Sequence, residues 1–192
     1  FDDVFVADKR RLEKIVDLVK YENYLFRCFG RANLLTKEIC SLLKTMGVFE
    51  VGIGVESGST HILKQNMKGT TKEMNTQAVK NLQQFGIRAK AFLIVGLPGE
   101  SEETVKETKQ WIETARPDDL DVSILQPMPG SVLFREPEKY GINFTYDSNP
   151  LWYKGKPSEY KSSFSTKDLS ADRIVELRDE IESLYKDKTL LR

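Results

Sequence analysis

The 192-residue sequence has few side chains of the kind that bind transition metals, with two cysteines and one histidine. Cys28 and Cys40 lie in a strand-like and a helix-like segment, and their spacing fits neither a disulfide framework nor a zinc or iron-sulfur site. We expect both to be reduced structural thiols, because free cysteine is commonly buried. His61 has no cysteine partner at metal-ligand spacing, so we expect a surface or packing role for it.

The sequence also lacks an excess of charge of either sign, since 29 Lys and Arg residues balance 29 Asp and Glu residues. This balance gives no electrostatic indication that the protein binds nucleic acid or an anionic membrane. No run of about 18 apolar residues is present to span a bilayer, and no signal peptide is recognisable. We therefore expect a cytoplasmic protein with no membrane partner.

Common nucleotide-binding and hydrolase motifs are missing as well. Gly52, Gly54 and Gly58 do not have the GxGxxG spacing, and they lie inside a strand-like segment instead of opening a helix, which excludes a dinucleotide fingerprint. No Gly-rich phosphate loop and no ordered set of Ser, His and Asp can be assembled.

Alternating helix and strand signals are what the sequence does contain. The periodicity predicts strands over 24–30, 49–56, 88–96 and 119–126, with a strand stub at the first residues. Between them it predicts helices over 9–21, 36–47, 70–86 and 101–115, the third opened by a capping box of Thr70 and Glu73. Such alternation is typical of a parallel sheet built from βαβ units, either an open doubly wound sheet or an arc of a barrel.

The composition changes at Pro127, where aromatic, proline, glycine and charged residues replace the periodic pattern. We interpret this part as an irregular extension, followed by a last helix that Ser170 caps and that ends near Lys186. The expected organisation is a barrel-like part over residues 1–134 and an extension with a terminal helix over residues 135–192.

Polar residues follow successive predicted strands where each strand ends: Asp2 and Asp3, Arg31 and Asn33, Glu56 and Ser57, Gly96 to Glu100, and Gln126. The carboxyl ends of parallel strands meet at one edge, so these residues are expected to surround one ligand. Structural roles are the alternative. Asp2 and Asp3 would then start a turn, Arg31 would pair with a nearby carboxylate, and Glu56 would form a salt bridge with Arg31 or Lys90.

Five segments in order resemble the radical S-adenosylmethionine (radical SAM) family, which uses S-adenosylmethionine (SAM). They are "FDDVF", "RCFGRANLLTKEICSLLKTMG", "VGIGVESGSTHILKQNMKGTT", "GIRAKAFLIVGLPGESEET" and "DDLDVSILQPMPGSVLF". The pattern is most similar to the branch whose members often carry a cobalamin-binding domain, and the related methylthiotransferases are also similar.

The resemblance implies a partial TIM-like (β/α)6 barrel, truncated at its amino end. In the family, a CxxxCxxC loop holds a 4Fe-4S cluster, and reductive cleavage of SAM yields a 5′-deoxyadenosyl radical for hydrogen abstraction or methyl transfer. CxxxCxxC is absent from this sequence, so we expect the cluster loop to lie upstream of Phe1. The resemblance implies that the parent protein is an enzyme, with cobalamin as a candidate further cofactor, and that this fragment alone is inactive.

The resemblance also implies roles for particular residues. Glu56 and Ser57 would contact the ribose hydroxyls of SAM, Asp2 and Asp3 its ammonium group, and Arg31 or Lys90 its carboxylate. "AFLIVGLPGE" resembles the family motif GxIxGxxE, with Ile94 and Gly96 in place but Phe92 at the first Gly and Gly99 at the Glu. Leu125 and Gln126, with the residues up to Met128, would flank the adenine.

The family implies a small-molecule or other organic substrate and an electron donor such as flavodoxin or ferredoxin. An exposed barrel edge would favour self-association of the chain. Two alternatives remain at this point: a non-catalytic nucleotide-binding or scaffold module with the same fold, and an ordinary α/β domain whose strand-end polar residues are structural.

Overall fold

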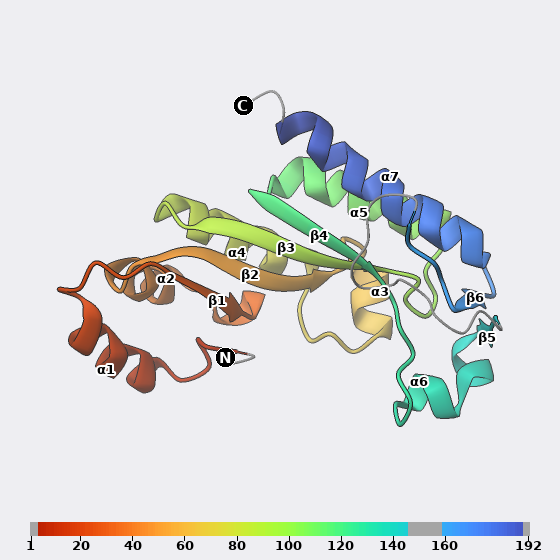
Figure 1. Cartoon of the computed structure of the whole chain (residues 1–192), viewed down its shortest axis with the longest axis horizontal. Coiled ribbons are helices and arrows are strands. Elements are labelled where there is room, and N and C mark those ends of the chain that lie inside the picture. Colours follow the sequence, from red (N-terminus) through yellow and green to blue (C-terminus); the bar gives the residue numbers. More distant parts are fainter. Residues whose placement is uncertain (1–3, 146–158, 190–192) are drawn as a thin grey trace. The chain divides into compact units, whose positions relative to one another are not determined.

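The computed structural model describes residues 4–145 and 159–189, and the side chains of the last helix up to residue 184. Asp2 and Asp3 lie outside the described residues. Figure 1 labels the elements, and those that surround the main sheet are α1 (Lys9–Val19), β1 (Phe26–Gly30), η1 (Ala32–Leu34), α2 (Lys37–Thr45), β2 (Val48–Glu56), α3 (Thr60–Gln65), α4 (Lys72–Gln84), β3 (Arg88–Val95), α5 (Glu102–Ala115) and β4 (Asp119–Ile124).

Four strands form one parallel sheet in which the spatial order follows the chain, β1-β2-β3-β4. β1 pairs with β2 in parallel, with Arg27 opposite Glu50 and Phe29 opposite Gly52. This topology confirms the predicted α/β fold with successive βα units. The predicted strand boundaries hold to within two residues at each end.

Side chains alternate between two different environments along the sheet. In β3, Ala89, Ala91, Leu93 and Val95 are buried, whereas Lys90, Phe92 and Ile94 are only half-buried. The buried set is apolar and covered by helices, while the intervening residues lie on what we call the open face of the sheet. In β3 the polar and aromatic side chains therefore belong to one face.

Helix starts follow side-chain capping, with one difference from the prediction. Asp8 accepts a hydrogen bond from Arg11 N, and Thr36 accepts one from Ile39 N. The cap of α4 is Thr71, whose Oγ1 accepts from Met74 N, so the prediction that Thr70 caps this helix is wrong. Thr71 has the extended backbone that a cap needs, whereas the side chain of Thr70 is buried.

The described residues form two compact units. The first holds α1, β1, α2 and α4 and the starts of β2, β3 and β4. In it α1 packs on α2, and α2 packs on α4 (Figure 1). The second holds α3, most of α5, and the carboxyl ends of β2, β3 and β4 with everything after them. The expected boundary between residues 134 and 135 stays a prediction.

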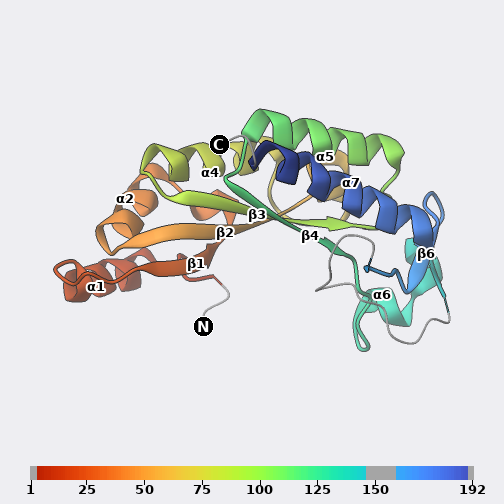
Figure 2. The same ribbon diagram turned by 45° about the horizontal axis from the view of Figure 1, so that its top comes forward.

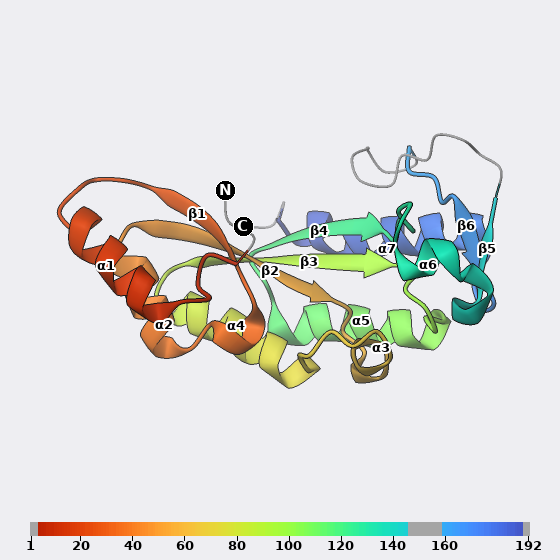
Figure 3. The ribbon, with the colours of Figure 1, turned by 90° about the horizontal axis from the view of Figure 1, so that it is seen from below.

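The second unit also contains elements beyond the main sheet, namely α6 (Val132–Arg135), η2 (Pro137–Tyr140), β5 (Ile142–Phe144), β6 (Phe164–Thr166) and α7 (Ala171–Thr189). β5 and β6 pair in antiparallel orientation, close to α6 (Figure 3). α7 runs beside α5 (Figure 2), and Ser170 caps it by accepting from Arg173 N. The predicted last helix is confirmed, whereas the two short strands inside the expected irregular extension had not been predicted.

Candidate functional site

Glu56 occupies the last position of β2 with an unusual backbone. Its φ is 64°, in the left-handed region that residues other than glycine seldom adopt. Such a conformation costs on the order of 1–3 kcal/mol and persists only where the surroundings enforce it, which is why it is concentrated at functional sites. The chain therefore changes direction directly after the strand, at the residue that carries the carboxylate.

Lys68 is the partner of this carboxylate. Its Nζ lies 2.6 Å from Glu56 Oε1, and both side chains are about three-quarters buried. The sequence analysis considered Arg31 or Lys90 as the salt-bridge partner of Glu56, whereas the structure shows Lys68 in this position. Sequence reasoning missed this contact, because Glu56 and Lys68 are twelve residues apart and the loop after α3 must fold back to bring them together.

Hydrogen bonds connect the loop that carries Lys68 both to α3 and to the turn after β3. Lys68 N donates to Leu63 O, which ends α3 in a tight turn. The Asn66 side chain donates to Ile62 O (2.9 Å) and to Pro98 O (3.1 Å). The second bond links this loop to the turn that follows β3, so the Glu56–Lys68 pair and that turn form one connected structure.

Ser57 has its hydroxyl inside the protein. Ser57 Oγ shares a hydrogen bond of 3.2 Å with Thr108 Oγ1 and accepts one from Ser59 N. Thr108 Oγ1 also accepts from Gly58 N and donates to Thr104 O. These bonds fasten the segment after Glu56 to α5, so the structure gives the Ser57 side chain a supporting position behind the carboxylate.

The turn after β3 is closed by a buried carboxylate. Glu100 is 2% exposed, and its Oε2 accepts from Gly96 N at 2.6 Å. Burial raises the pKa of Glu100 to about 7, although hydrogen bonds from the backbone of Gly96 and Leu97 lower it. Gly96 has a φ of 91°, which a side chain at this position would strain. The acidic residue of this turn is thus Glu100, one position after Gly99.

Ile94, Leu125 and Gln126 lie next to this turn. Ile94 is half-buried on the open face of β3, and Leu125 N donates to Val95 O at 2.8 Å, which places the end of β4 beside the end of β3. Gln126 Oε1 accepts from Ser163 Oγ. Five residues of the predicted site belong to the second unit, namely Glu56, Ile94, Gly96, Leu125 and Gln126.

Arg31 and Lys90 belong to the first unit. Arg31 is exposed at the start of η1, and Lys90 lies 3.2 Å from Asp119 Oδ2 with its ammonium group over the Phe92 ring. Their predicted role toward a ligand carboxylate remains a prediction, as does that of Asp2 and Asp3. Lys68, which the sequence did not single out, supplies a cation directly at Glu56.

Among residues 4–145 and 159–189, no group of three or more His, Cys, Asp or Glu side chains is arranged to hold a metal ion. Cys28 and Cys40 are free cysteines, as expected. Burial raises the pKa of Cys28 to about 12 and that of Cys40 to about 11, which keeps both as neutral thiols. Since iron is bound by thiolates, these residues do not fit a 4Fe-4S cluster.

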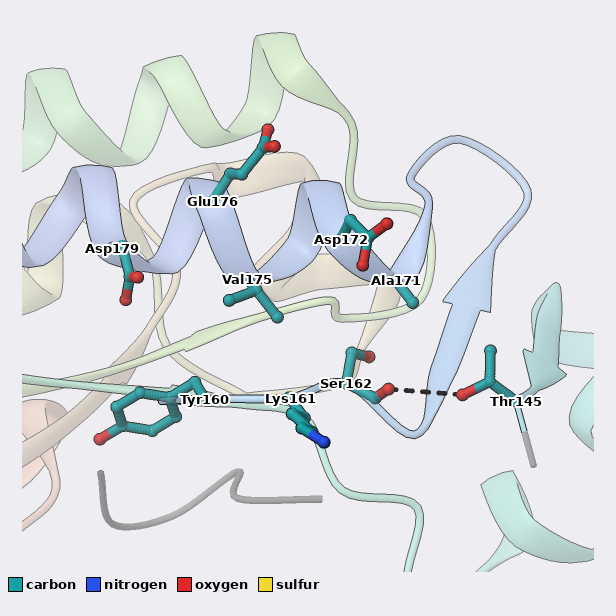
Figure 4. A pocket seen from close by; sticks show the side chains of 9 residues that line it. All are labelled: Thr145, Tyr160, Lys161, Ser162, Ala171, Asp172, Val175, Glu176 and Asp179. Atoms are coloured by element: carbon teal, nitrogen blue, oxygen red, sulfur yellow. Dashed lines mark hydrogen bonds between the residues drawn. The ribbon is translucent and has the colours of Figure 1, made fainter. Parts of the chain in front are cut away.

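A separate hollow of about 670 Å³ lies in the second unit (Figure 4). Residues 160–162 line one side, and Asp172, Val175 and Asp179 of α7 line the other. None of the predicted cofactor-binding residues lines this hollow, so it is distinct from the site at Glu56.

Comparison with known protein families identifies the family of this chain. Residues 4–112 match the model of the radical SAM superfamily, which is more than half of the chain. The chain belongs to the radical SAM superfamily. Members of this superfamily use SAM and a 4Fe-4S cluster.

Curated relatives of this radical SAM chain point in the same direction. A Methanocaldococcus jannaschii protein with a methylthiotransferase name is 35% identical over 122 residues, which are 64% of this chain and 27% of that protein. The bacteriochlorophyllide d C-12(1)-methyltransferase of Chlorobaculum tepidum is 28% identical over 163 residues, covering 83% of this chain and 34% of that enzyme. The chain thus spans about a third of these relatives or less.

Solved structures support the same fold. TsrM, a radical SAM methyltransferase from Kitasatospora setae with cobalamin and a 4Fe-4S cluster bound, aligns with a TM-score of 0.63 at 19% identity, over 76% of this chain and 32% of TsrM. A TsrM structure with tryptophan substrate and a SAM analogue aligns with a TM-score of 0.53. The identity is 20%, and the alignment covers 59% of this chain and 23% of that TsrM chain. These likenesses confirm the partial radical SAM barrel.

Among the described residues, none of the helices combines the length and apolarity needed to cross a bilayer. His61 is exposed near the start of α3, consistent with the expected surface position.

Proposed function

We propose that this chain forms the ribose and adenine side of the SAM site of a radical SAM enzyme. The observation that carries the proposal is the left-handed backbone of Glu56 at the end of β2, together with its carboxylate paired with Lys68 and the buried Ser57 turn that follows it. Two neighbouring ribose hydroxyls need an acceptor with two oxygens, and a carboxylate supplies them.

The other residues of the site fit the remaining parts of SAM. Ile94 and Leu125 offer apolar surface to an adenine ring, beside a turn whose backbone Glu100 holds in place. Lys68 places an ammonium group next to Glu56, where an anionic group of the ligand would find a donor. Arg31 and Lys90 remain candidates for the methionyl carboxylate, and Asp2 and Asp3 for its ammonium group.

We infer that the whole protein is a radical SAM oxidoreductase or methyltransferase acting on a small organic molecule. The 4Fe-4S cluster of the family supplies the electron that cleaves SAM. Neither Cys28 nor Cys40 fits as a ligand of this cluster, because burial raises the pKa of both thiols. Cobalamin as a second cofactor, by analogy with TsrM, and flavodoxin or ferredoxin as electron donor complete the proposal.

Anaerobic iron reconstitution of the longest natural form of the protein tests this function, with the 192-residue chain as the comparison. We expect iron uptake with visible absorption in the long form, and release of 5′-deoxyadenosine from SAM on reduction. A long form that binds SAM but stays colourless would instead indicate a non-catalytic SAM-binding module.

A further inference from the structure

Two polar side chains are buried at the start of α4, within the first unit. Thr70 comes directly before the Thr71 cap and is 7% exposed, and Asn75 is the fourth residue of the helix and is 0% exposed. At many helix starts these two positions carry apolar side chains that pack against each other. Here both positions carry hydrogen-bonding groups, which need partners when they are buried.

One hydrogen bond determines which way the Asn75 amide faces. Asn75 Nδ2 donates to Val55 O at 3.5 Å. The opposite orientation of the amide would set Asn75 Oδ1 against Val55 O, and neither of these two acceptors carries a proton. Asn75 Oδ1 is therefore the atom that needs a donor from elsewhere.

Two oxygens at this helix start are left over. Among the described residues, neither Thr70 Oγ1 nor Asn75 Oδ1 has a hydrogen-bond partner, and both atoms are buried. Asn81, a second buried asparagine of α4, differs because its Nδ2 donates to Leu35 O and its Oδ1 accepts from Gln77 Nε2, both at 2.8 Å. Buried polar atoms in folded proteins nearly always pair with another protein group or with an ordered water.

We propose that a buried water molecule binds between Thr70 and Asn75. The water donates one proton to Asn75 Oδ1 and accepts the proton of the Thr70 hydroxyl, which satisfies both oxygens with the two or more partners that a buried water needs. Both side chains are neutral, which suits a neutral ligand. Through Asn75, the water connects the start of α4 to the Val55 carbonyl of β2, and this role does not depend on the proposed function.

A crystal structure of the chain, at a resolution that shows ordered water, tests the proposal directly. We expect one density peak at hydrogen-bond distance, about 3 Å, from both Thr70 Oγ1 and Asn75 Oδ1. Thr70→Val keeps the shape of the side chain but removes the hydroxyl, so the peak should weaken or disappear in that variant. A parent structure without density between the two side chains would overturn the proposal.

A double-mutant cycle tests whether the two side chains share one water in solution. Thr70→Val and Asn75→Leu each leave the other side chain and the water short of a partner, whereas the double variant replaces the whole polar site with apolar groups. We therefore expect the double variant to lose less free energy of unfolding than the two single variants together.

Thr70→Val combined with Asn81→Leu is the matched control, because Asn81 is buried in the same helix but has its own partners. The losses of this second pair should add. Additive losses for Thr70 and Asn75, or the same departure from additivity in the control pair, would contradict a shared water. If Asn75→Leu does not fold, the density in the parent and in Thr70→Val still decides.

Discussion

At the site, buried hydrogen bonds and an ion pair hold the individual polar residues in position. The Glu56 carboxylate pairs with Lys68, and the next residue, Ser57, is hydrogen-bonded to the Thr108 hydroxyl. The buried Glu100 carboxylate accepts the hydrogen bond of the Gly96 amide. Buried polar atoms of this kind are costly when a partner is removed. Their contributions are therefore measurable as changes in stability that do not depend on any ligand.

Thr108→Val removes a hydroxyl with little change in shape. We expect the free energy of unfolding to fall by about 1–3 kcal/mol, because Gly58 N and Ser57 Oγ lose a buried partner. Denaturant unfolding measures the loss. Thr45→Val is a matched control, since Thr45 also donates to the carbonyl four residues earlier but is exposed, and a similar loss there would contradict the account.

Glu100→Gln should change how stability depends on pH. Burial raises the pKa of Glu100 in the folded chain to about 7, above its value in the unfolded chain, so the folded state holds a proton that the unfolded state releases between about pH 4.5 and 7. The free energy of unfolding of the parent chain should therefore fall as pH rises through this window, by up to about 3 kcal/mol from this group.

The Gln variant has no such proton, so the difference between variant and parent stability should grow in favour of the variant across that window. Unfolding curves at several pH values measure this difference. Glu103→Gln, which changes an exposed carboxylate in α5, should run parallel to the parent. A parallel curve for Glu100→Gln would show that Glu100 titrates normally.

At the scale of elements, two arginines in different environments attach α7 to the rest of the second unit. Arg178 is 1% exposed, donates from Nε to Val122 O, pairs with Asp179 and Glu182, and lies 3.6 Å from the centre of the Tyr160 ring. Arg173 is more exposed and forms a bidentate pair with Glu102 of α5. A buried ion pair that loses one partner costs far more than an exposed one.

Arg178→Leu should therefore lower the free energy of unfolding by about 3–5 kcal/mol. Arg173→Leu should cost about 1 kcal/mol or less, and this cost should shrink in high salt. Unfolding at low and at high ionic strength compares the two variants. Equal losses, or a strong salt dependence for Arg178→Leu, would contradict the different roles assigned to them.

Sequence reasoning predicted the four strands and the four long helices up to residue 126, because each carries a full helical or strand period and most have a turn or cap at their ends. It missed β5 and β6, since three residues are too few to show a period. It placed the α4 cap at Thr70 and not at Thr71, because the two neighbours are both threonines and only the backbone conformation distinguishes them. The Glu56–Lys68 pair was missed because a left-handed glutamate leaves no mark in the sequence.

At the scale of the whole molecule, β1 lies at one end of the sheet order. One backbone carbonyl of this edge strand already has a partner, because Phe5 N donates to Phe29 O at 3.2 Å. Leu25, just before the strand, is exposed. Strand edges pair with other chains unless charge prevents it. The self-association expected from the sequence is therefore still our prediction for this chain.

Sedimentation of the 192-residue chain should show a mass that rises with concentration. Leu25→Lys should lower the association, because a charge beside the edge opposes strand pairing. Leu18→Lys changes an equally exposed leucine within α1 and should leave the association unchanged. A monomer mass at every concentration would refute the prediction.

The most direct test of the SAM site is the affinity of the longest natural form of the protein for SAM, measured by calorimetry with Glu56→Gln and the control Glu103→Gln. We expect Glu56→Gln to weaken binding about tenfold or more, because a charged acceptor of hydrogen bonds contributes about 1.5–3 kcal/mol, and the control to match the parent. Unchanged affinity in a folded Glu56→Gln variant would contradict the assignment and leave Glu56 as a structural partner of Lys68.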